Sequence, residues 1–370
     1  MNTERLLELC EKLIAVEAKF DVQSILQQLV TDVQNMVGNP GQPQFQNAYA
    51  SRLVELTSAW RSLTSSFEPR EAEQIAEIGG TEFFLSDLPK EIEDIAQANP
   101  HTPSVTQQFV SQFHGRRNTY LGNLAQLRDR LRDIGVEIAP LPPGSAEIGL
   151  LVPRTLFHNA FDELIKELGT LNRIIRAFSE IATGSAERVE VHQISTSDPT
   201  FFLGLSVETA QLLGGAITWA ITTWASVEGI RKLRSETKKN KSFTDEEIKQ
   251  FFESKIEKSL KAAVDEKVAE ILGPPTDKAG RSKEQRTDLA WALESVLTRV
   301  ERGMTMELRF LPPKPEQDAD GKEVPEPEVY QQLREMAPQL KFPASEPSPV
   351  LELPPPEPPS ETKRSKSGTG

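Results

Sequence analysis

The chain has 370 residues, of which 37% are hydrophobic and 26% charged, and its formal net charge at pH 7 is −13. This length allows two or three domains, and the acidic balance argues against general affinity for nucleic acid, which needs a cationic surface to displace counterions. Cys10 is the single cysteine, so an intrachain disulfide is excluded, and the 4 histidines are too scattered to indicate a zinc site. The N-terminal sequence lacks the apolar core of a signal peptide, which predicts a cytoplasmic protein.

Residues 1–139 are predicted to form a helical bundle. Apolar side chains recur at three- and four-residue spacing, and proline or glycine separates the periodic segments. Asp21 precedes the second segment and is expected to cap its helix. Pro69, Pro89 and Pro103 are each expected to open a helix, because proline is tolerated in the first turn. The connections are short, which favours antiparallel neighbours around one core.

The pattern changes in the proline- and glycine-rich segment 139–147, which predicts a domain boundary. Residues 140–313 are expected to form an α+β domain with a central apolar helix. Short runs of alternating apolar residues indicate strands near 148–152, 189–191 and 306–310. Longer periodic segments predict helices near 155–183, 209–227, 245–272 and 282–302. The predicted fold class is therefore α+β and predominantly helical: an N-terminal helical bundle, then a small, mainly antiparallel sheet packed with long helices.

Residues 314–370 are rich in proline and acid, and they are predicted to form a largely disordered tail. Only 330–340 has the pattern of a helix. The tail contains P-x-x-P spacings, such as Pro312 to Pro315, which fit aromatic peptide-binding grooves. A plain linker is the favoured interpretation of such a segment.

Residues 209–227 contain no charged side chain and are long enough to cross a bilayer. The run is nevertheless dilute in Leu, Ile and Val, so we favour a helix buried in its own domain over self-association or membrane insertion. Burial would make Gly215→Glu and Ala220→Glu strongly destabilising. Small and aromatic side chains mark the candidate surface for helix packing or self-association: Gly214, Gly215, Ala216, Trp219, Ala220 and Trp224.

A basic cluster follows this run. Its members are candidate contacts for phosphate or a membrane surface: Arg231, Lys232, Arg234, Lys238, Lys239 and Lys241. The favoured alternative is a solvated helix end, where cations complement the negative end of the helix dipole.

No nucleotide-binding, metalloprotease or hydrolase motif occurs in the chain, and we assign no catalytic, cofactor-binding or metal-binding residue. Arg154, His158 and Asp162 are the first candidates for an active site that lacks a recognisable sequence motif, because a carboxylate one helical turn from a histidine can orient a general base. A surface pair on a helix is the favoured interpretation.

These observations favour a non-enzymatic scaffold, adaptor or regulatory subunit of a larger cytoplasmic assembly. Its expected partners are proteins, with a homo-oligomer as one form of assembly, and neither a cofactor nor nucleic acid is expected. One alternative is a membrane-active conditional effector that inserts helix 209–227, although membrane contact is not favoured. The second alternative is an enzyme without a recognisable motif.

Overall fold

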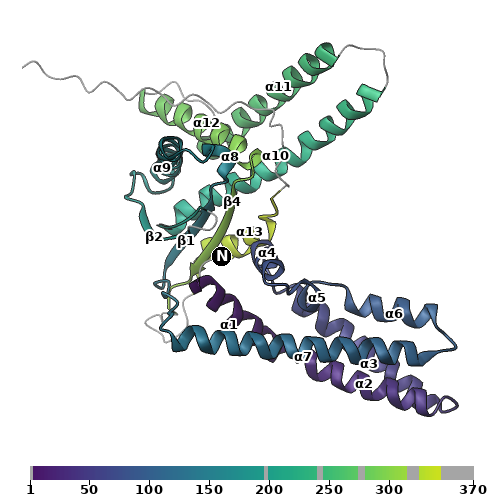
Figure 1. The fold of residues 1–370 in the computed structure, drawn as a ribbon. Helices are drawn as coiled ribbons and strands as arrows, with labels where there is room; N and C mark the ends of the chain where they lie inside the picture. Colours follow the sequence, from purple (N-terminus) through teal and green to yellow (C-terminus); the bar gives the residue numbers. More distant parts are fainter. Residues whose placement is uncertain (1–2, 196–198, 240–244, 274–279, 315–324, 343–370) are drawn as a thin grey trace, which may run out of the picture. The chain divides into compact units, whose positions relative to one another are not determined.

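The computed structural model describes residues 3–195, 199–239, 245–273, 280–314 and 325–342, with side chains left undescribed at 227–255 and 280–282. The chain divides into two compact units, Met1–Pro140 and Leu141–Gly370, whose elements are labelled in Figure 1. Among the described residues, the first unit contains helices alone, and the second adds a small antiparallel sheet. The predicted fold class, α+β and predominantly helical, is confirmed.

The first unit is a bundle in which α1, α2, α3 and α7 supply most of the packing (Figure 1). Proline occupies the first turn of α3, α4, α6 and α7, where its missing N–H costs no helical hydrogen bond. The bounds of the helices are α1 Thr3–Phe20, α2 Val22–Gly38, α3 Pro43–Thr64, α4 Pro69–Glu77, α5 Thr81–Phe84, α6 Leu88–Ala98 and α7 Pro103–Asp133.

A buried polar network fixes the corner between α1 and α2. Asp21 adopts a left-handed conformation with φ 49° and makes no side-chain cap, so its predicted capping role is wrong. The Glu17 side chain instead accepts the backbone N–H of Gln23 at 2.7 Å. Arg117, on α7, is 0% exposed and donates to Glu17 Oε2 at 2.5 Å, to Gln23 Oε1 at 3.1 Å and to the carbonyl of Phe83 at 3.2 Å. One guanidinium thus connects α1, α2, α5 and α7.

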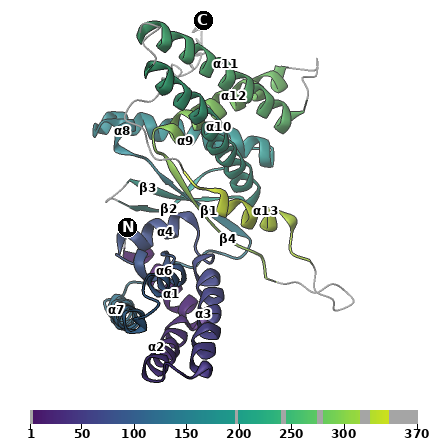
Figure 2. The ribbon, with the colours of Figure 1, turned by 90° about the vertical axis from the view of Figure 1, so that its right-hand side faces the viewer.

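The second unit is built on a four-stranded antiparallel sheet with the order β2-β3-β1-β4. Figure 2 shows the long helices of this unit gathered over one face of the sheet. The strands are β1 Ser145–Leu151, β2 Glu190–Ser195, β3 Thr200–Leu205 and β4 Thr305–Leu311. The helices are α8 Arg154–Phe157, α9 Phe161–Thr183, α10 Val207–Lys239, α11 Asp245–Leu272, α12 Gly280–Glu301 and α13 Glu328–Met336, followed by the short 3-10 helix η1 Ala337–Gln339.

The strand register explains which side chains meet the helices. Ile148 on β1 lies opposite Leu203 on β3 and Leu308 on β4. Directly opposed side chains in an antiparallel pair point to the same face. These three residues are 0%, 8% and 4% exposed and belong to one hydrophobic core with the helices. The alternation of Met306, Leu308 and Phe310 therefore marked the core face of β4.

The single helix expected over 155–183 is interrupted. His158 and Asn159 have φ values of 49° and 56°, a left-handed conformation that a continuing helix does not allow. The chain therefore ends α8 at Phe157 and begins α9 at Phe161. The Arg154 Nη1 group donates to Asn159 Oδ1 at 3.2 Å across the break. The prediction failed because the apolar period continues across two residues whose backbone turns.

The uncharged run lies inside α10. Ala216, Ala220 and Trp224 are 1%, 0% and 4% exposed, and Trp224 Nε1 donates to the carbonyl of Leu297 on α12 at 2.7 Å. Trp219 is partly buried against the same core. Among the residues whose positions are described, none of the helices combines the length and apolarity needed to cross a membrane.

Helix α13 packs against α10, and Gly214 provides the space for the contact. A Cβ atom at Gly214 would collide with the sulfur of Met336, whereas a Cβ at Gly215 would meet nothing within 4 Å. Gln211 also donates to the side-chain oxygen of Gln332. Gly214 is therefore a helix-packing residue, but Gly215 borders open space, so its expected place in the core is wrong.

The basic cluster falls at the end of α10. Arg231, Lys232, Arg234, Lys238 and Lys239 belong to the helix, but their side chains lie outside the described part of the structure. Lys241 lies outside the described residues altogether. The proposed phosphate or membrane contacts at these positions stay a prediction.

Candidate functional site

Strand β2 stands at one margin of the sheet and presents two apolar side chains to solvent. Val191 is 58% exposed and Ile194 is 54% exposed. Val191 lies opposite Leu203, and Ile194 lies opposite Phe201. Because Leu203 and Phe201 are two residues apart on β3, both exposed side chains point toward the helix-covered face of the sheet. We call Val191 and Ile194 on this strand the β2 edge.

A β-bulge places these two side chains on one face. Residues 191 and 194 are three apart, so a regular strand would point them to opposite faces. The pairing shifts between Val191 and Gln193, which leaves His192 as the extra residue. A bulge of this kind sets two residues opposite one on the neighbouring strand and restores the alternation beyond it. The β2 edge therefore depends on the extra residue, His192.

The extra residue is held by a polar contact across the sheet. His192 Nδ1 lies 2.8 Å from Glu147 Oε2 on β1, and Glu147 Oε1 accepts from Arg309 Nη1 on β4 at 2.9 Å. The Glu147 side chain is 7% exposed and that of His192 is 33% exposed. The partner of His192 lies 45 positions earlier in the chain, so no local spacing in the sequence could reveal this contact.

Gly204 on β3 makes room for the His192 ring. A Cβ atom built at Gly204 would collide with Nε2 of His192, and the neighbouring carbons of the ring would also be too close. Gly204 lies opposite Glu147 on one side and Glu190 on the other. The absence of a side chain at this position thus lets the imidazole lie across β3 and reach the carboxylate on β1.

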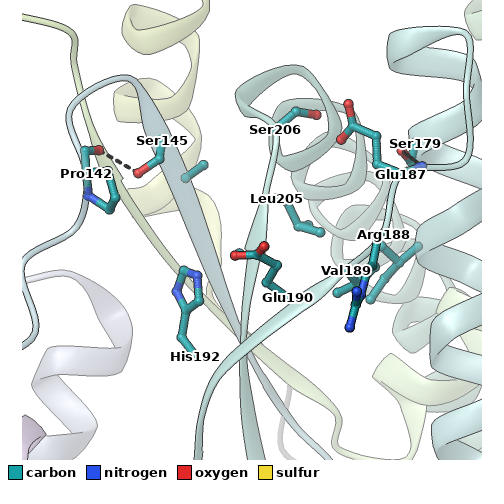
Figure 3. A pocket seen from close by; sticks show the side chains of 13 residues that line it. Pro142, Ser145, Ser179, Glu187, Arg188, Val189, Glu190, His192, Leu205 and Ser206 are labelled. Atoms are coloured by element: carbon teal, nitrogen blue, oxygen red, sulfur yellow. Dashed lines mark hydrogen bonds between the residues drawn. The ribbon is translucent and has the colours of Figure 1, made fainter.

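An open cavity of about 260 Å³ borders β2 at Glu190 and His192. Figure 3 shows His192 at one end of the view and Ser206 and Glu187 at the other. The cavity is lined by the three strands β1, β2 and β3, by α9 and by three short connecting segments, which lie before β1, before β2 and after β3. The lining residues are Pro142, Ser145, Ala146, Ile175, Ser179, Glu187, Arg188, Val189, Glu190, His192, Gly204, Leu205 and Ser206.

The serine hydroxyls around this cavity support the local backbone. Ser145 donates to the carbonyl of Pro142 at 2.5 Å. Ser179 donates to the carbonyl of Ser185 at 3.1 Å and accepts the N–H of Glu187 at 3.1 Å, which fixes the loop between α9 and β2. Ser206 accepts the N–H of Thr209 at 3.3 Å in the first turn of α10. These contacts shape the cavity wall and the approach to β2.

The residues first considered for an active site do not share a helix. Arg154 lies on α8, His158 follows its last residue in a left-handed conformation, and Asp162 lies in the first turn of α9. The predicted one-turn spacing of His158 and Asp162 on a single helix is therefore wrong. Asp162 instead lies 3.8 Å from the ammonium of Lys166.

A second exposed apolar pair lies on α9. Phe161 is 76% exposed and Ile165, one helical turn later, is 55% exposed. This pair resembles the β2 edge in exposure, but it lacks the main-chain groups that a strand at a sheet margin offers to an incoming chain. It therefore serves as a matched surface for comparison.

Among the side chains that the structure describes, no group of three or more His, Cys, Asp and Glu could hold a metal ion. Comparison of the chain with protein-family models, with curated proteins and with solved structures gave no match.

Proposed function

We propose that this protein is a non-enzymatic scaffold, adaptor or regulatory subunit of a larger cytoplasmic assembly, and that it binds a protein through the β2 edge. The observation that supports this proposal is the pair of apolar side chains, 58% and 54% exposed, on a strand at the margin of the sheet. A marginal strand can accept an additional strand through main-chain hydrogen bonds.

The character of the β2 edge favours a binding role. Proteins usually protect marginal strands with charged side chains, with proline, or with bulges that turn the strand away. Here the bulge places Val191 and Ile194 together on one face. The contact of His192 with Glu147 holds that arrangement in place. A partner that covers both side chains would remove apolar surface from water at a site already ordered for binding.

The expected contact combines two contributions. Main-chain hydrogen bonds along β2 supply affinity that depends little on the sequence of the partner, whereas Val191 and Ile194 select apolar side chains opposite them. Burial of one such side chain contributes roughly 1.5–3 kcal/mol before the entropy of association is subtracted. A single charged substitution within the β2 edge should therefore weaken the complex severely.

Site-specific photo-crosslinking in cells that express the protein tests the proposal. A photoreactive amino acid at Val191 or Ile194 should yield covalent adducts with a protein. The same amino acid at Glu266, an exposed position on α11, is the control. Adducts from both β2 positions that are absent from Glu266 are the expected result. Equal capture at all three positions, or no adduct from β2, would contradict the proposal.

A further inference from the structure

We infer that the partner of the β2 edge is the β2 edge of a second copy of this chain, paired antiparallel about a twofold axis. The inference rests on the proposed function, because both assign a protein contact to the same strand. It adds the identity of the partner and the register of the contact.

The sequence of β2 is complementary to itself in one antiparallel register. The strand reads EVHQIS from Glu190 to Ser195. If its two central residues lie opposite each other across the twofold axis, Val191 of each copy lies opposite Ile194 of the other. Each exposed apolar side chain then meets another apolar side chain, and both members of each pair point to the same face. The bulge is what makes this match possible.

The pairing would extend the hydrophobic core without a break. Val191 and Ile194 lie beside Leu203 and Phe201, which are 8% and 9% exposed in the core of the second unit. In the paired form, this row continues through the two β2 strands into the same residues of the second copy. Two four-stranded sheets become one sheet in which β2 is no longer marginal. A twofold contact of this kind closes on itself and ends at a dimer.

The charged and polar residues of the strand are compatible with this register. Glu190 lies opposite Ser195 of the second copy, and His192 lies opposite Gln193. Like charges directly opposite each other destabilise a strand pair, and this register contains no such pair within Glu190–Ser195. The His192 ring is turned toward Glu147 and Gly204 of its own sheet.

Cysteine pairing tests the register directly. Cys10 is 0% exposed, so it does not compete with new surface cysteines for disulfide formation and need not be replaced. Val191→Cys and Ile194→Cys are purified separately and then mixed under mild oxidation. The mixture should give a disulfide-linked dimer rapidly, because directly opposed Cα atoms in an antiparallel pair are about 4.5–5.5 Å apart, within disulfide range.

Each single variant alone is the control. Residues 191 of the two copies would be offset by three positions, about 10 Å along the strand, which is beyond the roughly 7 Å limit for a disulfide. Faster linkage in the mixture than in either variant alone is the expected result. Equal linkage in all three samples would overturn the register.

Sedimentation velocity over a concentration series tests the partner itself. The wild type should dimerise, Ile194→Lys should remain monomeric, and Ile165→Lys, a change at a site of 55% exposure on α9, should still dimerise. A wild type that is monomeric throughout would overturn the inference. If Val191 crosslinks a different protein in cells, the proposed function stands, but the inference that the partner is a second copy of this chain is wrong. If it crosslinks nothing, both are wrong.

Discussion

Two buried arginines illustrate how single residues hold this chain together. Arg117 satisfies three acceptors in the first unit, and Trp60 and Phe84 lie 5.7 and 5.4 Å from its guanidinium. In the second unit, Arg299 on α12 binds both carboxylate oxygens of Glu167 on α9, at 2.6 and 2.7 Å. Removing one member of a buried pair leaves the other charge without compensation, which costs more than the pair itself contributes.

We predict that Arg117→Met lowers the free energy of unfolding of the first unit by about 3 kcal/mol, because Glu17, whose side chain is 13% exposed, would lose its fully buried charged partner. The neighbouring residue provides the control. Arg116 pairs with Glu82 at 2.5 Å, but these side chains are 55% and 45% exposed. Arg116→Met should therefore cost about 0–1 kcal/mol. Urea denaturation of both variants measures the difference, and equal losses would contradict it.

Cys10 should make the stability of the first unit depend on pH in the alkaline range. Burial raises the pKa of the Cys10 thiol from 9.0 to about 11, so the folded state favours the protonated form. That stabilisation is complete below pH 9 and is lost as the pH rises toward 11. The unfolding free energy should fall across this range, and Cys10→Ala should reduce the fall. An identical pH profile for the variant would show that another group is responsible.

Gly204→Ala should disturb the β2 edge, because the new methyl group would occupy the space of the His192 ring. We expect faster hydrogen–deuterium exchange in β2 and weaker partner binding. Gly169→Ala on α9 is the control, since a Cβ there meets nothing within 4 Å and alanine favours a helix. Unchanged exchange in the Gly204→Ala variant would mean that the position of His192 does not determine the conformation of β2.

At the scale of elements, the helices were predictable and the sheet margin was not. Helix periodicity and proline positions give the bundle, because both signals are local. The bulge in β2 depends on Glu147 and Gly204, which lie on two other strands. Nothing in the local pattern of Val189, Glu190 and Val191 indicates it. The left-handed turn at His158 was missed for a related reason, since the apolar period continues on both sides of it.

The contact between α10 and α13 also required the structure. The sequence pointed to Gly214 and Gly215 together, but only Gly214 faces Met336.

We predict that Gly214→Leu destabilises the second unit by about 1–3 kcal/mol through overpacking. Gly215→Leu should be neutral or stabilising, because helix propensity improves and the position borders open space. Thermal unfolding compares the two variants. Equal destabilisation would indicate that α13 does not pack at Gly214.

At the scale of the whole molecule, each unit has a core of its own. Leu13, Leu29 and Trp60 belong to the core of the first unit, whereas Ile148, Ala220 and Leu297 belong to that of the second. We predict two separable unfolding transitions and a protease-sensitive segment within 136–147. Arg117→Met should lower only one transition. A single transition shifted as a whole by this substitution would mean that the units unfold together.

Hydrogen–deuterium exchange of the β2 amides over a range of protein concentrations measures whether β2 pairs with a second copy in solution. Exchange within Glu190–Ser195 should become slower as the wild-type concentration rises, because a second strand protects its outer amides. The strand at the other margin, β4, should be unaffected, and Ile194→Lys should abolish the concentration dependence. Exchange in β2 that is equally fast at every concentration would mean that β2 does not pair with a second copy.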